Sequence, residues 1–134
     1  MTRKIFVNLP IKDLKTSVAF FTGLGFTFNP HFTDETSACM IIGDDAYAML
    51  LSEPRFKDFT TKTISDTSKS TEAIIALSGE SRADVDAFAA KALATGGSPA
   101  MPATDLGFMY GRSFYDPDGH HWEIFYMDPA AVPG

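Results

Sequence analysis

Apolar and polar positions in the first fifty residues predict a strand, a helix and three further strands. The run Ile5–Ile11 is apolar and rich in β-branched residues, and Pro10 restricts it to a sheet edge or a strand end. Asp13 is placed to cap a helix that ends at Gly23 or Gly25. Its apolar face has helical spacing and comprises Leu14, Val18 and Phe21. The three later strands are predicted from Phe26–Phe28 with Phe32, at Ala38–Ile42 and at Tyr47–Leu51.

The second half of the chain repeats this order. An apolar strand at Ala73–Leu77 precedes Ser81, which starts a second helix in a capping-box-like sequence. That helix ends at Gly96-Gly97. Three strands are predicted after it, at about Ser98–Met101, Phe108–Tyr115 and His121–Met127, with the last two joined by the turn Asp116-Pro-Asp-Gly119.

Two βαβββ modules therefore predict an α+β fold within one domain, 1–134. The first module covers about 1–52, the second about 72–128, and a Thr- and Ser-rich connector covers 53–71. Neither half is large enough to close a core alone, so we expect two paired, curved mixed sheets around a cleft, which is the natural ligand site.

Composition and charge narrow the class of partner. The chain has 134 residues, 45% of them hydrophobic, and a net charge of −6 without any Lys/Arg cluster, which argues against nucleic-acid binding. No apolar run approaches the length of a membrane span. The single cysteine, Cys39, lies in an apolar run and is expected to be a buried thiol. These features favour a cytoplasmic protein with a small-molecule partner.

The motifs Ser17-Val-Ala-Phe-Phe21, Leu24-Gly25-Phe26 and Phe114-Tyr-Asp-Pro-Asp-Gly-His120, followed by Trp122-Glu-Ile124, resemble the vicinal oxygen chelate superfamily. This superfamily includes glyoxalase I, bleomycin-resistance proteins, fosfomycin-resistance transferases and extradiol dioxygenases. The chain is most similar to small bacterial proteins described as predicted lactoylglutathione lyases, and the resemblance covers nearly its whole length.

The resemblance also implies where a metal would be held. Metal-binding members place one ligand, usually His, on the first strand of each half and another, usually Glu, on the last. Glu123 matches the final position, but Phe6 and Ile74 stand where the two histidines would be, and the strand Tyr47–Leu51 offers no carboxylate. We therefore predict no metal site and no cofactor, with a divalent metal bound by non-standard ligands, such as His121 with Glu123, as the alternative.

Glu123 is the candidate catalytic residue, since a carboxyl desolvated in the cleft could exchange a proton near neutral pH. The alternative is a structural pair with Arg112 across the hairpin. Arg112 shares a strand face with Tyr110 and could clamp an anionic group of a ligand. His121 is two residues from Glu123 and so shares its face, whereas His120 is expected in an exposed turn.

The other candidate ligand-binding residues are aromatic or polar positions on predicted strands: Phe6, Asn8, Tyr47 and Phe125, with Met127 as a further lining residue. Their aromatic character favours a flat or aromatic ligand. Asn8 could equally satisfy a neighbouring strand.

Three functions compete. The first is a metal-free protein of the bleomycin-resistance type that binds a small hydrophobic or aromatic molecule. The second is a metal-dependent lyase or isomerase like lactoylglutathione lyase, or a dioxygenase, that uses Glu123. The third is a non-catalytic interaction role. We also expect a homodimer, because the connector carries Phe56 and Phe59 among charged residues.

Overall fold

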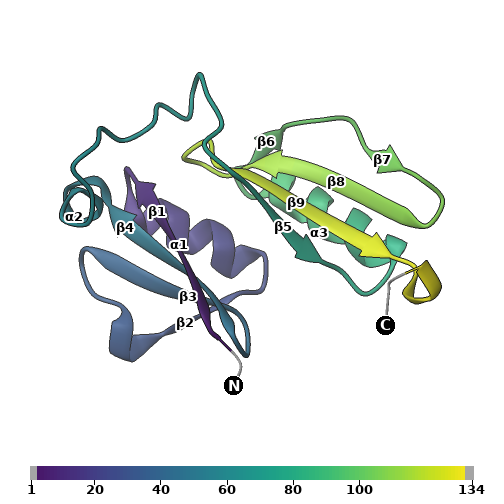
Figure 1. Ribbon diagram of the computed structural model, residues 1–134, viewed down its shortest axis with the longest axis horizontal. Coiled ribbons are helices and arrows are strands. Elements are labelled where there is room, and N and C mark those ends of the chain that lie inside the picture. The colour runs from purple at the N-terminus through teal and green to yellow at the C-terminus, as the bar shows by residue number, and fades with distance from the viewer. Residues whose placement is uncertain (1–2, 132–134) are drawn as a thin grey trace. The chain divides into compact units, whose positions relative to one another are not determined.

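The first unit is a mixed four-stranded sheet with one helix packed on it. The computed structural model describes residues 3–131, and its contacts divide the chain between Asp66 and Thr67 (Figure 1). The elements of the first unit are β1 (Ile5–Ile11), α1 (Leu14–Gly23), β2 (Thr27–Asn29), the 3-10 turn Pro30–Phe32, β3 (Ser37–Gly43), β4 (Ala46–Ser52) and α2 (Glu53–Lys57). The strand order is β1-β4-β3-β2, in which only β1 and β4 are parallel.

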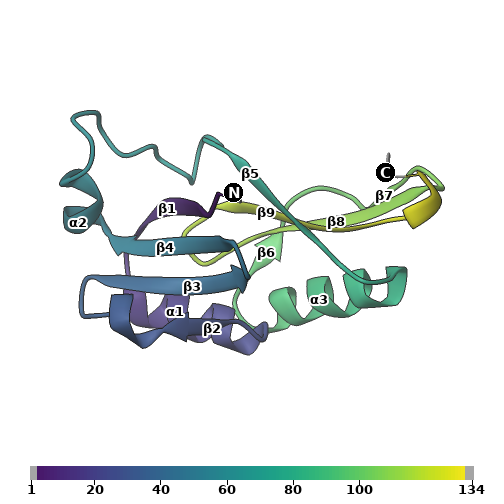
Figure 2. The ribbon, with the colours of Figure 1, turned by 60° about the horizontal axis from the view of Figure 1, so that its bottom comes forward.

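Helix α1 covers one face of this sheet because its apolar residues recur at helical spacing. It begins at the cap Asp13, whose carboxylate accepts a hydrogen bond from the Thr16 amide, and it buries Phe20 and Phe21. Figure 2 shows the helix running along β3 and β4. The sheet residues buried beneath it alternate along their strands: Leu9, Ile11, Ala38, Met40, Ala48 and Leu50.

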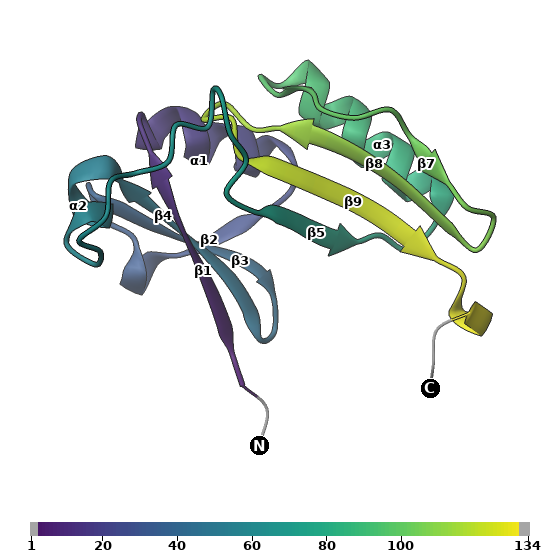
Figure 3. The same ribbon diagram turned by 45° about the horizontal axis from the view of Figure 1, so that its top comes forward.

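The second unit repeats the arrangement. Its elements are β5 (Ile74–Ser78), α3 (Arg82–Ala94), β6 (Ser98–Pro99), β7 (Thr104–Asp105), β8 (Met109–Tyr115), β9 (His121–Met127) and the 3-10 turn Pro129–Ala131. The strand order is β5-β9-β8-β6, and β7 also pairs with β8. Figure 3 shows β5, β9 and β8 side by side, with α3 behind them.

The core of the second unit lies between α3 and the sheet. Val85 and Ala89 of the helix pack on Ile124 of β9, and the rings of Phe88 and Phe114 lie 6.0 Å apart. Trp122, the only tryptophan, is fully buried. Even-numbered residues of β8 and β9 thus face the helix, and odd-numbered residues face away from it.

The predicted α+β fold of two βαβββ-like modules is confirmed. Four short elements were not predicted: α2, β7 and the two 3-10 turns, and Phe32 lies in the first of these turns rather than in a strand. Within 53–71 the structure has helix α2, which starts because Ser52 caps it and Pro54 fits its first turn. Strand β7 is only two residues long, too short for an alternating pattern to be recognised. Cys39 is buried and unbridged, as expected.

The turn between β8 and β9 is buried rather than exposed, which corrects the expectation for His120. Its imidazole is only 2% exposed and lies 2.8 Å from the carboxylate of Glu72. Asp116 organises the turn by accepting hydrogen bonds from the backbone amides of Asp118 and His120 and from the Trp122 indole. Burial raises the pKa of Asp116 above its usual value.

Arg82 and Asp105 join the start of α3 to the β7–β8 turn. The guanidinium of Arg82 donates to both carboxylate oxygens of Asp105 at 2.9 Å, and this charge-assisted pair lowers the pKa of Asp105 from 3.8 to about 2. Because the folded-state pKa is depressed, the pair stabilises the fold above pH 3.8, and this contribution is lost as the pH falls towards 2.

In an NMR pH titration, we therefore expect the Asp105 carboxyl to titrate with a midpoint near pH 2. The substitution Arg82→Gln should return that midpoint towards pH 3.8. Asp86 provides an internal comparison, because its pKa is also lowered, but mainly by hydrogen bonds from Tyr110 and Arg112. An unchanged Asp105 midpoint in the variant would show that the Arg82 pair is not its cause.

Among residues 3–131, no helix is both long enough and apolar enough to cross a bilayer.

Candidate functional site

The face of the second sheet opposite α3, here called the helix-distal face, carries a small pocket. The pocket has a volume of about 240 Å³. Strands β5, β8 and β9 contribute Ile74, Gly111, Arg112, Ser113, His121 and Glu123. The loop after β6 contributes Met101 and Pro102, and β7 contributes Thr104. Apart from Arg112, each residue of β5, β8 and β9 reaches this face because side chains alternate along a strand and the register aligns Ile74 with His121 and Ser113 with Glu123.

The segment that closes one side of the pocket is tied to the sheet through Ser113. The Ser113 hydroxyl accepts a hydrogen bond from the Met101 amide at 2.9 Å and donates to the Met101 carbonyl at 3.4 Å. Met101 therefore stays beside the pocket although its side chain is 65% exposed. Ile74, on the edge strand β5, also lines the pocket and is 58% exposed. The rim of the pocket is apolar on both sides.

Glu123 lies half-buried beneath this rim, over Gly111. A Cβ atom added to Gly111 would lie 3.7 Å from the Glu123 carboxyl carbon, so the glycine leaves the space above it open to that carboxylate. Among residues 3–131, none forms an ion pair or hydrogen bond with the Glu123 side chain. A carboxylate without a protein partner in a pocket is available to a ligand.

His121 is the second polar group at this site. His121 is only 8% exposed. Its ring lies edge-on to the ring of Tyr115, with the two ring centres 5.3 Å apart. No hydrogen bond from another described residue reaches its imidazole nitrogens. The sequence prediction that His121 and Glu123 share a face is confirmed by the strand register.

Arg112 does not pair with Glu123, and this expectation is wrong. Arg112 lies opposite Ile124, on the helix side of the sheet, and its guanidinium donates to Asp86 of α3 at 3.1 Å. Tyr110 shares that face, as predicted, and its hydroxyl donates to the same carboxylate at 2.6 Å. The polar ends of both side chains are thus bound to Asp86 of α3, although Arg112 is among the residues that line the pocket.

The remaining sequence candidates lie on other parts of the two sheets. Phe125 shares the helix-distal face with Glu123 but is not among the residues lining the pocket. Phe6, Asn8 and Tyr47 lie on the face of the first sheet opposite α1, where the rings of Phe6 and Tyr47 stack 4.7 Å apart. The Asn8 amide donates to the carbonyl of Phe6 in its own strand.

Ser113, Gly111, Met101 and Thr104 were missed by sequence reasoning. Ser113 could have been found by counting across the hairpin with the right register, since it stands directly opposite Glu123. Met101 and Thr104 carry no periodic signal, because Met101 lies in the loop between two very short strands and Thr104 begins the second of them, β7.

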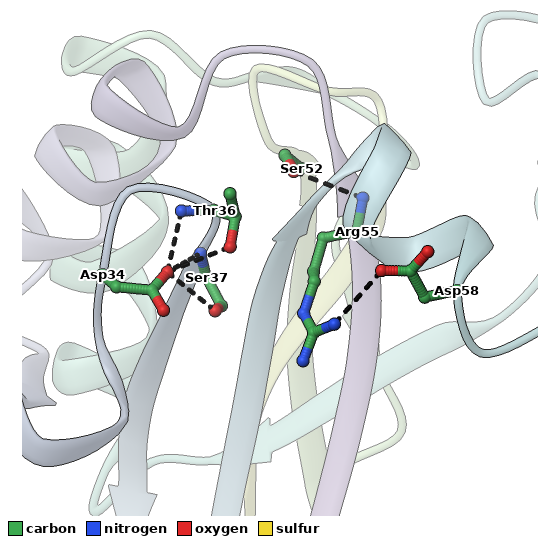
Figure 4. A network of polar contacts seen from close by, with 6 residues as sticks. All are labelled: Asp34, Thr36, Ser37, Ser52, Arg55 and Asp58. Carbon is green, nitrogen blue, oxygen red and sulfur yellow. Dashed lines mark hydrogen bonds and ion pairs between the residues drawn. The ribbon is translucent and has the colours of Figure 1, made fainter.

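The first unit has its own, larger groove of about 800 Å³ between α1 and the segment Thr33–Ala38. Its wall is mostly apolar, formed by Leu14, Val18 and Ala19 of the helix. The Asp34 carboxylate beside it accepts hydrogen bonds from the amides and hydroxyls of Thr36 and Ser37, as Figure 4 shows. These contacts lower the pKa of Asp34. All four of these hydrogen bonds end on one oxygen of Asp34, Oδ1, and the charged side chains of Lys15 and Glu35 also line the groove.

A metal ion does not fit the residues present. Within residues 3–131 no three His, Cys, Asp or Glu side chains lie close enough together to hold one. In the first sheet, the face opposite α1 carries Phe6, Asn8, Tyr47 and Met49, and none of these has a carboxylate or an imidazole. Divalent cations need several oxygen or nitrogen ligands, and His121 with Glu123 supplies two.

Comparisons with known proteins agree with this fold. The model of the Glyoxalase/Bleomycin resistance protein/Dioxygenase superfamily matches residues 5–124. Among solved structures, the hypothetical protein SA1046 from S. aureus has 25% identity and a TM-score of 0.79, covering 94% of both chains. A glyoxalase-related enzyme from Fulvimarina pelagi has 19% identity and a TM-score of 0.78, covering 94% of this chain and 88% of its own.

A third solved structure, a glyoxalase/bleomycin resistance protein/dioxygenase family enzyme from Burkholderia phytofirmans, has 13% identity and a TM-score of 0.77, covering 94% of this chain and 99% of its own. No curated protein matches the sequence.

Proposed function

Because the chain belongs to the glyoxalase/bleomycin resistance protein/dioxygenase superfamily, we propose that it binds a small organic molecule in the pocket of its second unit, without a divalent metal. The observation that carries this proposal is the combination of an apolar rim with two polar side chains, His121 and Glu123, that have no hydrogen-bonding partner among residues 3–131. Ligand sites commonly pair an apolar wall with a few convergent polar groups.

The rim supports a hydrophobic or aromatic ligand. Ile74 and Met101 are more than half exposed, although large apolar side chains are favoured by burial. Covering them with a ligand would gain roughly 25 cal/mol for each Å² of apolar surface removed from water. A methionine sulfur also makes favourable contacts with aromatic rings.

A metal-dependent lyase or isomerase like lactoylglutathione lyase, or a dioxygenase, is the second candidate. The observation in its favour is Glu123, which stands at the position where metal-binding relatives carry their last ligand. In this alternative Glu123 would be the catalytic residue. The incomplete ligand set makes it the weaker candidate.

A homodimer and a cytoplasmic location stay predictions. Of the two connector phenylalanines, Phe59 is 66% exposed, with the Arg55 guanidinium 4.8 Å from its ring centre. A non-catalytic interaction role is the third possibility, and a site that takes up no small molecule would favour it.

A metabolite screen followed by amide NMR shifts tests the binding proposal. We expect ligands that raise the unfolding temperature to shift the amide signals of Gly111, Ser113 and Glu123, because a ligand that binds only the folded state stabilises it. Gly111→Val fills the space over Glu123 and should abolish these shifts.

Signals of Val18 and Ala19 are the internal control, since they line the groove of the first unit. Ligands that shift only these two signals, or that bind the Gly111→Val variant as well as the wild type, would contradict the proposal.

A further inference from the structure

The charge of the second unit's pocket deepens this proposal, and the inference rests on the proposed function. Glu123 is the only carboxylate among the lining residues. The only lining residue with a cationic side chain, Arg112, directs its guanidinium to Asp86 on the other side of the sheet. Among the described residues, no Lys, Arg or His side chain forms an ion pair with the Glu123 carboxylate.

Burial strengthens the effect of this charge. His121 is only 8% exposed, and Glu123, on the same face of β9, is half-buried. Electrostatic interactions are stronger where protein replaces water. The chain as a whole has a net charge of −6, so its long-range field also favours the approach of cations.

The hydrogen-bonding groups point to the same ligand chemistry. An ionised carboxylate only accepts hydrogen bonds, so a ligand must present N–H or O–H donors to Glu123. A neutral imidazole adds one donor and one acceptor. A flat amidinium or guanidinium group presents two parallel N–H donors, which match the two oxygens of a carboxylate.

The volume sets the size of the ligand. At about 30 Å³ for each water molecule, about 240 Å³ corresponds to roughly eight waters, enough for a single ring with one substituent. The apolar side chains of Ile74, Met101 and Pro102 would lie against the ring. A flexible aliphatic amine would lose more conformational freedom on binding than a rigid ring.

We propose that this pocket selects small aromatic compounds that carry a cationic nitrogen group, held by the Glu123 carboxylate with His121 beside it, and rejects carboxylates and phosphates of the same shape.

Three compounds of nearly the same shape test the charge preference. Benzamidine is a cation, benzamide is neutral and benzoate is an anion. In amide NMR titrations of the full chain at about pH 8, where ordinary histidines are neutral, we expect benzamidine to bind at least about tenfold more tightly than benzamide. Benzoate should give no shifts at Gly111 or Ser113.

Glu123→Gln keeps the shape of the side chain and removes its charge, so it should abolish the preference for benzamidine. Glu80→Gln is the matched control, because it removes the same charge from an exposed position outside the pocket. It should leave the affinity within about twofold, since exposed charges are screened by solvent and salt.

Each outcome separates the two proposals. Equal binding of benzamide and benzamidine at Gly111 would overturn the charge preference and leave small-molecule binding intact. Tight benzoate binding, or a preference that survives in Glu123→Gln, would also overturn it. Failure of all three compounds to bind overturns the aromatic-cation inference, while the metabolite screen decides the proposed function independently. The wild-type comparison holds even if the Glu123 variant does not fold.

Discussion

The hemithioacetal of glutathione and methylglyoxal is expected to be turned over very slowly by the purified protein, with or without added nickel or zinc. Glyoxalase-type isomerisation passes through an enediolate, whose charge a Lewis-acid metal stabilises by several kcal/mol. Phe6 and Ile74 replace two expected ligands, and His121 and Glu123 remain as two donors on one strand. Losing about 4 kcal/mol of such stabilisation corresponds to roughly a thousandfold in rate.

The measurement is the absorbance of the thioester product, compared with that formed by an authentic glyoxalase I under the same conditions. Metal content of the purified protein should be measured on the same samples. Glu123→Gln should alter ligand affinity without changing this background rate. Robust metal-dependent turnover that Glu123→Gln abolishes would show that Glu123 belongs to a metal site whose other ligands lie outside the family positions.

Replacing Gly119 by alanine should destabilise the second unit strongly. Gly119 has a φ of +84°, and a Cβ atom there would lie 2.9 Å from the Thr67 carbonyl oxygen. The left-handed conformation alone costs an L-residue about 1–2 kcal/mol. The clash with backbone adds to this, because the Thr67 hydroxyl is itself hydrogen-bonded to the Asp118 carbonyl and holds that segment in place.

Gly25→Ala is the matched control. Gly25 also has a positive φ, +101°, but nothing lies within 4 Å of the Cβ it would gain. We expect Gly25→Ala to lower the free energy of unfolding by about 1–2 kcal/mol, and Gly119→Ala to lower it further. Urea unfolding followed by Trp122 fluorescence reports on the second unit directly, since Trp122 is the only tryptophan. If unfolding followed by circular dichroism shows the same loss of unfolding free energy for Gly119→Ala as for Gly25→Ala, then Thr67 moves aside to relieve the clash.

Several local features follow from the sequence because their causes are local. The Asp13 and Ser81 caps start their helices as predicted, and the βαβββ order recurs in both halves. Strict alternation along β9 places His121 and Glu123 on one face and Trp122 on the other, whatever the rest of the fold does.

The pocket depends on strand register, which no single strand determines. The sequence prediction paired Arg112 with Glu123, whereas the structure pairs Ser113 with Glu123, one residue away. A shift of one residue moves every side chain of a strand to the other face. Here the Arg112 guanidinium binds Asp86 on the helix side, and Ser113 stands opposite Glu123 instead. The Glu123 carboxylate is therefore not paired with Arg112.

By itself the sequence determined the two repeated modules, their helix caps, the buried Cys39 and the shared face of His121 and Glu123. These follow from period and capping chemistry, which act over a few residues. Only the tertiary structure decided that His120 is buried against Glu72 and that Met101 closes the pocket through Ser113. Those contacts join residues 48 and 12 positions apart, and packing of the folded chain, rather than local pattern, selects them.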